Sequence, residues 1–191
     1  ALAQAHRLVA AGADILDIGG ESTKPGSSPI AVEEEIKRVV PVISIIAAEK
    51  LVPVSVDTYK FEVAAAALEA GANMLNDQWG LKKDKRLAEL AARWRVPIVL
   101  MSNQRDKGGY SASEQRDTGY YKNVTEEVIS SLSYSIKTAL EAGILPENII
   151  IDPGIGFGKT WQQDCRIIRC LRDLQALGKP ILVGPSRKSL I

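Results

Sequence analysis

Short apolar runs alternate with longer amphipathic segments along the whole chain. One unit recurs around residues 10–17, 69–77 and 141–152: a helical pattern that ends in glycine, an apolar run, and then a polar residue. Glycine just past a helix supplies the left-handed conformation of a C-cap, and the apolar run after it is typical of a buried strand. Further apolar runs predict three more strands, at 52–57, 97–101 and 180–184.

Helical patterns separate the predicted strands. They lie at 32–49, 60–70, 84–94, 125–142 and 162–177. Six strands that alternate with helices predict an α/β fold, in which helical crossovers connect the strands of a parallel sheet. The strands are nearly continuous apolar runs, as expected when both faces of the sheet are covered.

Polar side chains follow the predicted strands, at or just beyond their carboxyl ends. They are Asp17, Asp57, Asn76 with Asp77, Ser102 with Asn103, Asp152, and Ser186 to Ser189. In a (β/α)8 barrel the active face lies at that end of every strand, whereas an open doubly wound sheet concentrates its polar residues at one switch point. The distribution therefore favours a barrel.

The chain is short for such a barrel. Eight strands and about 250 residues are typical, whereas six strands are predicted in these 191 residues. We therefore predict a single domain over residues 1–191 that forms an incomplete (β/α)8 TIM barrel, from helix 1 through strand 7. Strand 1, the rest of helix 7 and the last βα unit would lie outside this segment.

Composition narrows the classes of function. The net charge is +1 and Lys and Glu are interspersed, which argues against a nucleic-acid partner. No apolar run approaches the roughly 20 residues of a membrane helix and no leader pattern opens the chain, so we predict a cytoplasmic protein without a membrane contact.

His6 is the single histidine, which disfavours a histidine-based triad or zinc site. Cys165 and Cys170 lie about 140° apart around a predicted helix, so we expect free thiols.

A glycine-rich loop follows the apolar run at 149–151 and has the sequence Asp-Pro-Gly-Ile-Gly-Phe-Gly-Lys-Thr. It is not a P-loop, because Pro153 stands where the first glycine is needed, and it is not a dinucleotide fingerprint, because Lys159 replaces the third glycine. Acids that end buried strands are costly unless they are used or paired, so Asp57 and Asp152 are candidate site residues. Lys159 is expected to be a solvated or helix-start residue.

Five motifs occur in order along the chain: 17–26 (DIGGESTKPG), 55–58 (SVDT), 76–77 (ND), 152–159 (DPGIGFGK) and 184–189 (GPSRKS). Together they resemble the ordered motifs of the dihydropteroate synthase family. The resemblance implies a transferase of folate biosynthesis that is a target of sulfonamides. It would join 4-aminobenzoate to 6-hydroxymethyl-7,8-dihydropterin diphosphate, giving 7,8-dihydropteroate and diphosphate.

The resemblance also implies roles for individual residues. The residues implied in catalysis are Lys188, Asp152 and Thr23. Those implied in binding the pterin are Asp57, Asn76, Met101, Asp152 and Lys188. Those implied around the aminobenzoate, including a loop, are Thr23, Lys24, Pro25, Phe157 and Ser189. The chemistry is plausible, because a pterin presents an edge of N–H donors and carboxylates accept such donors well.

The chain departs from the family pattern at two positions and lacks the family's metal ligand. Lys24 stands where the family usually has arginine, and Ser102 follows Met101 where the family commonly has histidine. The family implies Mg²⁺ on the diphosphate, bound by an asparagine after strand 1 that this chain does not contain, so no metal ligand is predicted here. A methyltetrahydrofolate-dependent corrinoid methyltransferase and a catalytically silent pterin-binding homologue stay open as alternatives. A homodimer is expected for the full-length protein, and the segment alone is expected to be inactive.

Overall fold

The computed structural model of the chain describes residues 1–23, 27–105 and 124–185. Its sheet has five strands, β1 (Leu16–Gly19), β2 (Val54–Asp57), β3 (Met74–Asp77), β4 (Ile98–Met101) and β5 (Ile149–Asp152). The α-helices are α1 (Leu2–Ala10), α2 (Val32–Glu49), α3 (Phe61–Glu69), α4 (Arg86–Trp94), α5 (Val124–Glu141), α6 (Trp161–Arg169) and α7 (Leu171–Leu174). Two short 3₁₀ turns, η4 (Pro146–Asn148) and η5 (Gln175–Leu177), complete the described elements.

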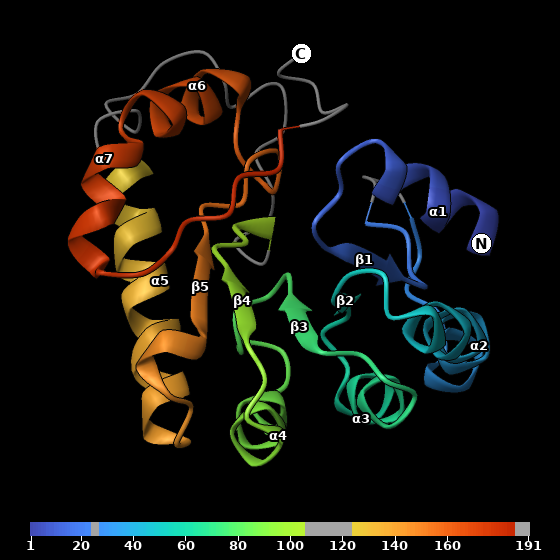
Figure 1. Cartoon of the computed structure of the whole chain (residues 1–191). Coiled ribbons are helices and arrows are strands. Elements are labelled where there is room, and N and C mark those ends of the chain that lie inside the picture. The colour runs from blue at the N-terminus through green and yellow to red at the C-terminus, as the bar shows by residue number, and fades with distance from the viewer. Residues whose placement is uncertain (24–26, 106–123, 186–191) are drawn as a thin grey trace.

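The strands are parallel, and each one pairs with the next along the chain, in the order β1-β2-β3-β4-β5. The sheet curves, and α2, α3, α4 and α5 follow one another along its outer side (Figure 1). A doubly wound sheet reverses its strand order at a switch point, whereas a barrel adds each strand beside the last. The observed order is therefore that of a (β/α)8 barrel. All carboxyl ends lie at one edge of the sheet.

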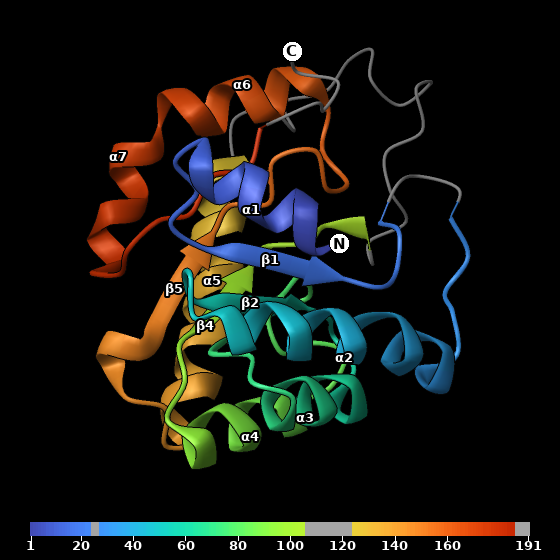
Figure 2. The same ribbon diagram turned by 45° about the vertical axis from the view of Figure 1, so that its right-hand side comes forward.

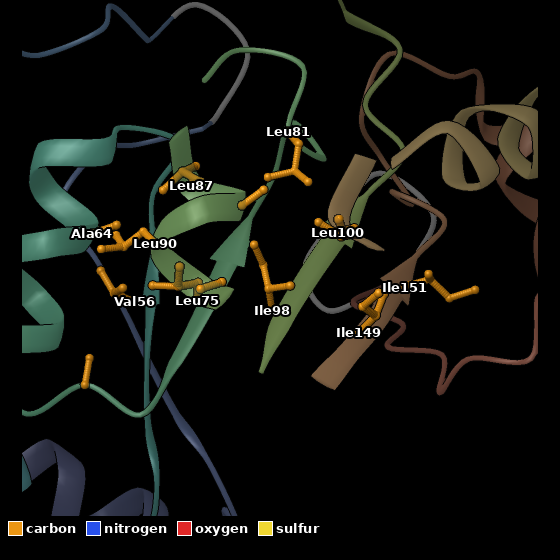
Figure 3. Close-up of a cluster of buried hydrophobic side chains, with 14 of the residues drawn as sticks. Val56, Ala64, Leu75, Leu81, Leu87, Leu90, Ile98, Leu100, Ile149 and Ile151 are labelled. Carbon is orange, nitrogen blue, oxygen red and sulfur yellow. The ribbon is translucent and has the colours of Figure 1, made fainter. Parts of the chain in front are cut away.

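The core lies between the strands and the helices that cover them. Val56, Leu75 and Ile98 come from neighbouring strands, and each is at most 1% exposed. They belong to one cluster with Leu87 and Leu90 of α4 (Figure 3). Burial of each large aliphatic side chain contributes about 1.5–3 kcal/mol, which fixes the strands firmly enough to position polar residues at their ends.

One predicted strand and one predicted helix differ from the structure. The segment 180–184 was predicted to be a strand, but this is wrong: it forms a single parallel bridge between Ile181 and Ile151. Two hydrogen bonds make that bridge, Ile151 N to Pro180 O and Leu182 N to Ile151 O, and Pro180 has no N–H to extend it. The helix predicted at 162–177 is interrupted at Cys170, which separates α6 from α7.

The edge of the sheet at β1 is flanked by two helices, with α1 on one side and α2 on the other (Figure 2). The amphipathic first segment thus forms a helix, although no strand precedes it in this chain. Within the residues that the structure describes, no helix combines the length and the apolar character needed to cross a bilayer.

Candidate active site

Acids and amides from the first three strands meet at the carboxyl edge of the sheet. The parallel register places Gly19 beside Asp57, and Asp57 beside Asn76. Asn76 Nδ2 donates to Asp17 Oδ2 at 2.9 Å, and Gln78 Nε2 donates to Asp57 Oδ1 at 2.6 Å. The sheet therefore converts residues that are far apart in sequence into one polar cluster.

Burial and like charge shift the proton affinity of this cluster. The pKa of Asp57 is raised to about 7, first by burial and then by the charge of Asp17, while the hydrogen bond from Gln78 opposes the shift. Burial also raises the pKa of Asp17, and the neighbouring Ser55 and Asn76 side chains lower it in part. Among the described residues, the groups that act on Asp57 are mainly other acids, and a carboxylate in such surroundings gains most from a ligand that donates hydrogen bonds.

The glycine-rich loop brings Asp152 next to the end of β4. Asp152 is buried at the end of β5, and its Oδ1 accepts a 2.6 Å hydrogen bond from Gly154 N. Gly154 has a φ of +71°, and a Cβ there would lie 2.2 Å from the carbonyl oxygen of Ser102. Glycine is required at this position because the loop backbone turns in the left-handed region directly against β4.

Lys159 is not the solvated residue that was expected. It is partly buried, and its Nζ donates to the carbonyl oxygens of Gly154 at 2.8 Å, Ser102 at 3.1 Å and Phe157 at 3.3 Å. Thr160 does begin α6, where it forms a capping box with Gln163. Lys159 therefore ties the loop after β5 to the segment after β4, and it contributes to the shape of the site.

Arg105 connects three loops of the site. Its Nη1 donates to the carbonyl oxygen of Thr23 at 2.7 Å, and its Cζ lies 4.4 Å from the centroid of the Phe157 ring. Thr23 and Arg105 also line a pocket of about 220 Å³, together with Gln78 and Asn103. The pocket lies beside the polar cluster, because Gln78 also donates to Asp57.

A buried ion cluster holds the base of the loop that carries Thr23. Lys60 Nζ lies 2.7 Å from Glu21 Oε2 and 2.6 Å from Glu35 Oε2, and it donates to the carbonyl oxygen of Ile30 at 2.7 Å. Burial acts to raise the pKa of Glu21, but Lys60, the amide of Ile30 and the hydroxyl of Tyr59 together hold that pKa below its ordinary value. Both ends of the loop, at Glu21 and Ile30, are thus bound to one ammonium group.

Asp77 has a structural position. It is buried, and its carboxylate accepts hydrogen bonds from the amides of Trp79 at 2.8 Å and Leu81 at 2.6 Å. Burial raises its pKa to about 6, against the lowering effect of these backbone donors. Asp77 therefore fixes the turn after β3 and leaves Asn76 and Gln78 to face the site.

The structure places six of the predicted site residues. Asp57, Met101 and Asp152 are the last residues of β2, β4 and β5, and Asn76 is the residue before the last of β3. Thr23 and Phe157 are joined through Arg105. The other predicted site residues lie outside the described residues; they are Lys24, Pro25, Lys188 and Ser189.

Four polar residues of the site were not predicted as members: Gln78, Asn103, Arg105 and Lys159. Gln78 directly follows β3, and Asn103 and Arg105 lie within four residues after β4, so their position after an apolar run is the signal that could have found them. Among residues 1–23, 27–105 and 124–185, no three His, Cys, Asp or Glu side chains are grouped so that they could bind a metal ion.

The family model described as "Pterin binding enzyme" matches the chain over residues 1–191. The chain belongs to this family. The dihydropteroate synthase of Clostridium beijerinckii is 50% identical over 180 residues, which make up 94% of this chain and 62% of that protein. The dihydropteroate synthase of Bacillus subtilis is 44% identical and is covered to 63%, so the chain spans less than two thirds of the length of these relatives.

A solved structure gives the same picture of the pterin-binding fold. The dihydropteroate synthase of Xanthomonas albilineans with 4-aminobenzoic acid is 42% identical, with a TM-score of 0.88 over 99% of this chain and 65% of that chain. The agreement confirms the predicted (β/α)8 barrel class, of which this chain contains the consecutive strands described above.

Proposed function

We propose that the protein is a dihydropteroate synthase. It would join 4-aminobenzoate to 6-hydroxymethyl-7,8-dihydropterin diphosphate and release diphosphate and 7,8-dihydropteroate. Family membership and the 50% identity to a dihydropteroate synthase support this proposal. The names of solved relatives support it too, since one contains 4-aminobenzoic acid and another 7,8-dihydropteroate.

The observation that carries the proposal is the polar cluster at the carboxyl edge. Asp57 is half-buried near Asp17 with its pKa raised to about 7, and Asn76 and Asp152 lie at the carboxyl ends of β3 and β5, on either side of β4. The 2-amino group and N3–H of a pterin are donors that buried carboxylates accept in a fork. We assign this role to Asp152 and Asp57, with Asn76 beside them and Met101 packing against the ring.

The reaction needs orientation more than acid–base chemistry. Loss of diphosphate leaves a methylene cation that the electron-rich dihydropterin delocalises, and the neutral aromatic amine then attacks that carbon. Catalysis would come from holding the two substrates in line and from stabilising the departing charge. Lys188, Ser189, Lys24 and Pro25 keep the roles that the resemblance implies, as predictions. Mg²⁺ on the diphosphate is likewise a prediction, and no step here is routed through it.

The amine would bind on the side of the site that holds Phe157 and Thr23. Phe157 is buried and contacts the guanidinium group of Arg105, and Thr23, on the loop after β1, accepts a hydrogen bond from the same group. A flat aromatic ring packs well against such an apolar wall.

The test is an assay of dihydropteroate formation by the full-length protein from the two substrates. Sulfonamides, as mimics of 4-aminobenzoate, should raise the apparent KM for 4-aminobenzoate and leave the KM for the pterin unchanged. Absence of product would contradict the proposal. Methyl transfer from methyltetrahydrofolate to a corrinoid would favour the methyltransferase, and pterin binding without turnover would favour a silent homologue.

We propose that residues 1–191 belong to one domain, because the described strands form one sheet over one core cluster. The homodimer, the cytoplasmic location and the lack of a nucleic-acid partner stay predictions. Size-exclusion chromatography with light scattering on the full-length protein would test the dimer.

A further inference from the structure

Arg105 lies where three loops of the barrel meet. It follows β4, its Nη1 donates to the carbonyl oxygen of Thr23 at 2.7 Å, and its Nη2 lies 3.5 Å from the carbonyl oxygen of Gly156. The guanidinium group is also placed over the ring of Phe157, with 4.4 Å between Cζ and the ring centroid. One planar group thus contacts the loop after β1 and the loop after β5.

The charge of Arg105 has no acidic partner within the part of the chain that the structure describes. Its side chain is partly buried, and burial lowers its pKa. Arg86 is the useful comparison. It also stacks on an aromatic ring, that of Phe61 at 4.7 Å, but it pairs with Asp84 and Glu62 at the surface. Arg105 is instead partly buried and donates to the backbone carbonyl oxygens of two loops, so it differs from an arginine that only stabilises the surface.

We propose that Arg105 is a positioning residue for the aromatic amine, which it serves by holding the Thr23 segment and the Phe157 ring in fixed relation to each other. This inference rests on the proposed function. Its physical basis is the shape of the guanidinium group, which can donate to carbonyl oxygens in its own plane while its face stacks on a ring. A lysine has the charge but cannot do both. Arg105 therefore supplies the planar cationic group that contacts both loops.

The first experiment compares steady-state kinetics of Arg105→Ala and Arg105→Lys with the wild type, in the full-length protein. Arg86→Ala is the matched control, because it removes another arginine that stacks on a ring. We expect both Arg105 variants to raise the KM for 4-aminobenzoate about tenfold or more, since a misplaced binding wall weakens only the substrate that contacts it. The KM for the pterin diphosphate should stay within about twofold, and Arg86→Ala should behave as wild type.

Three kinetic outcomes would overturn the inference. One is an unchanged KM for 4-aminobenzoate in Arg105→Ala. Another is an equal rise in the KM of both substrates, which would indicate a general structural role. The third is a wild-type KM in Arg105→Lys, which would mean that charge alone suffices. If the alanine variant fails to fold, the lysine variant still decides between these outcomes.

Hydrogen exchange separates this inference from the proposed function. In Arg105→Ala, the amides of residues 20–23 and 154–158 should exchange about tenfold faster, while those of α3 stay unchanged. Unchanged exchange in the two loop segments would overturn the positioning role, whether or not the protein makes dihydropteroate. If the wild type makes no dihydropteroate but Arg105→Ala still shows this faster exchange, the proposed function is refuted and the positioning contacts remain supported.

Discussion

The replacement of Lys60 by methionine should strongly destabilise the fold. The change removes the ammonium group and keeps most of the side-chain volume. In the structure, Nζ lies 2.7 Å from Glu21 Oε2 and 2.6 Å from Glu35 Oε2, and it donates to the carbonyl oxygen of Ile30 at 2.7 Å. The Lys60 side chain is 12% exposed, and that of Glu35 is 1% exposed. The variant would therefore leave two carboxylates together with little access to water.

Removal of one partner from a buried ion pair costs about 3–5 kcal/mol, because the remaining charge stays buried without compensation. We expect a loss of this size in the free energy of unfolding, which is a large share of the total of about 5–15 kcal/mol for a domain. For a domain of 150–250 residues each kcal/mol shifts Tm by about 2–4 °C. Lys60→Met should accordingly lower Tm by about 10 °C.

The assay is urea unfolding and thermal melting of the full-length protein, followed by circular dichroism. Lys137→Met is the matched control, because Lys137 pairs with Glu141 at 3.7 Å with both side chains well exposed. It should change the free energy of unfolding by less than about 0.5 kcal/mol. The double variant Lys60→Met with Glu35→Gln should recover part of the loss, since it removes one unpaired carboxylate. Equal effects of Lys60→Met and Lys137→Met would refute the reasoning.

The same cluster predicts a pH dependence. The pKa of Glu21 lies below its ordinary value of 4.5, despite burial, because Lys60, Ile30 and Tyr59 stabilise the ionised form. A carboxyl group with a depressed pKa in the folded state adds stability above its unfolded pKa and loses it as the pH falls. The difference in stability between the wild type and Lys60→Met should therefore be largest at neutral pH and shrink below about pH 4.5.

Three further predictions concern the carboxyl edge of the sheet. Asp152→Asn should lower kcat/KM by about 30- to 1,000-fold, or about 2–4 kcal/mol, with little change in Tm, because one charge-assisted contact is lost in the transition state. The control is Asp14→Asn, since Asp14 is exposed before β1. An unchanged kcat/KM in Asp152→Asn would remove Asp152 from the site. The pKa of Asp57 is raised to about 7. If the pterin binds the ionised form of Asp57, the pterin affinity measured by calorimetry should fall as the pH drops below 7, and protons should be released on binding. Asp57→Asn should abolish both effects, and a pH-independent pterin affinity in the wild type would contradict the assignment. Gly154→Ala should lower the free energy of unfolding by more than about 2 kcal/mol, because the new Cβ would lie 2.2 Å from Ser102 O at a φ of +71°. Gly178→Ala is the control: with a φ of +63° and open space around the new Cβ, it should lower that free energy by about 1 kcal/mol. Equal losses in urea unfolding would show that the close approach to Ser102 is not decisive.

The helices and most strands could be predicted from the sequence, because their signals are local. The spacing of apolar residues predicted a helix at 32–49, and α2 has those bounds. The apolar pattern fails where a strand also depends on backbone hydrogen bonds that the pattern does not report. At 180–184 the run is apolar, but a ladder also needs donors and neighbours, and the chain forms one bridge at Ile181.

The sequence alone determined which residues lie at the carboxyl ends of the strands, and therefore that Asp57, Asn76, Met101 and Asp152 share one edge of the sheet. The placement follows from chain order, since parallel strands align their carboxyl ends. It also determined that Gly154 belongs to a loop, although not why glycine is needed there.

The tertiary structure alone decided how charge and shape are distributed in the site. Arg105 contacts a residue 82 positions away, and Lys60 pairs with Glu21 and Glu35 at separations of 39 and 25. The pKa of Asp57 depends on burial and on Asp17, which lies on another strand. Such effects arise from distances through space, and a sequence gives only distances along the chain, so contacts between loops and shifts in proton affinity become visible once the sheet has brought those loops together.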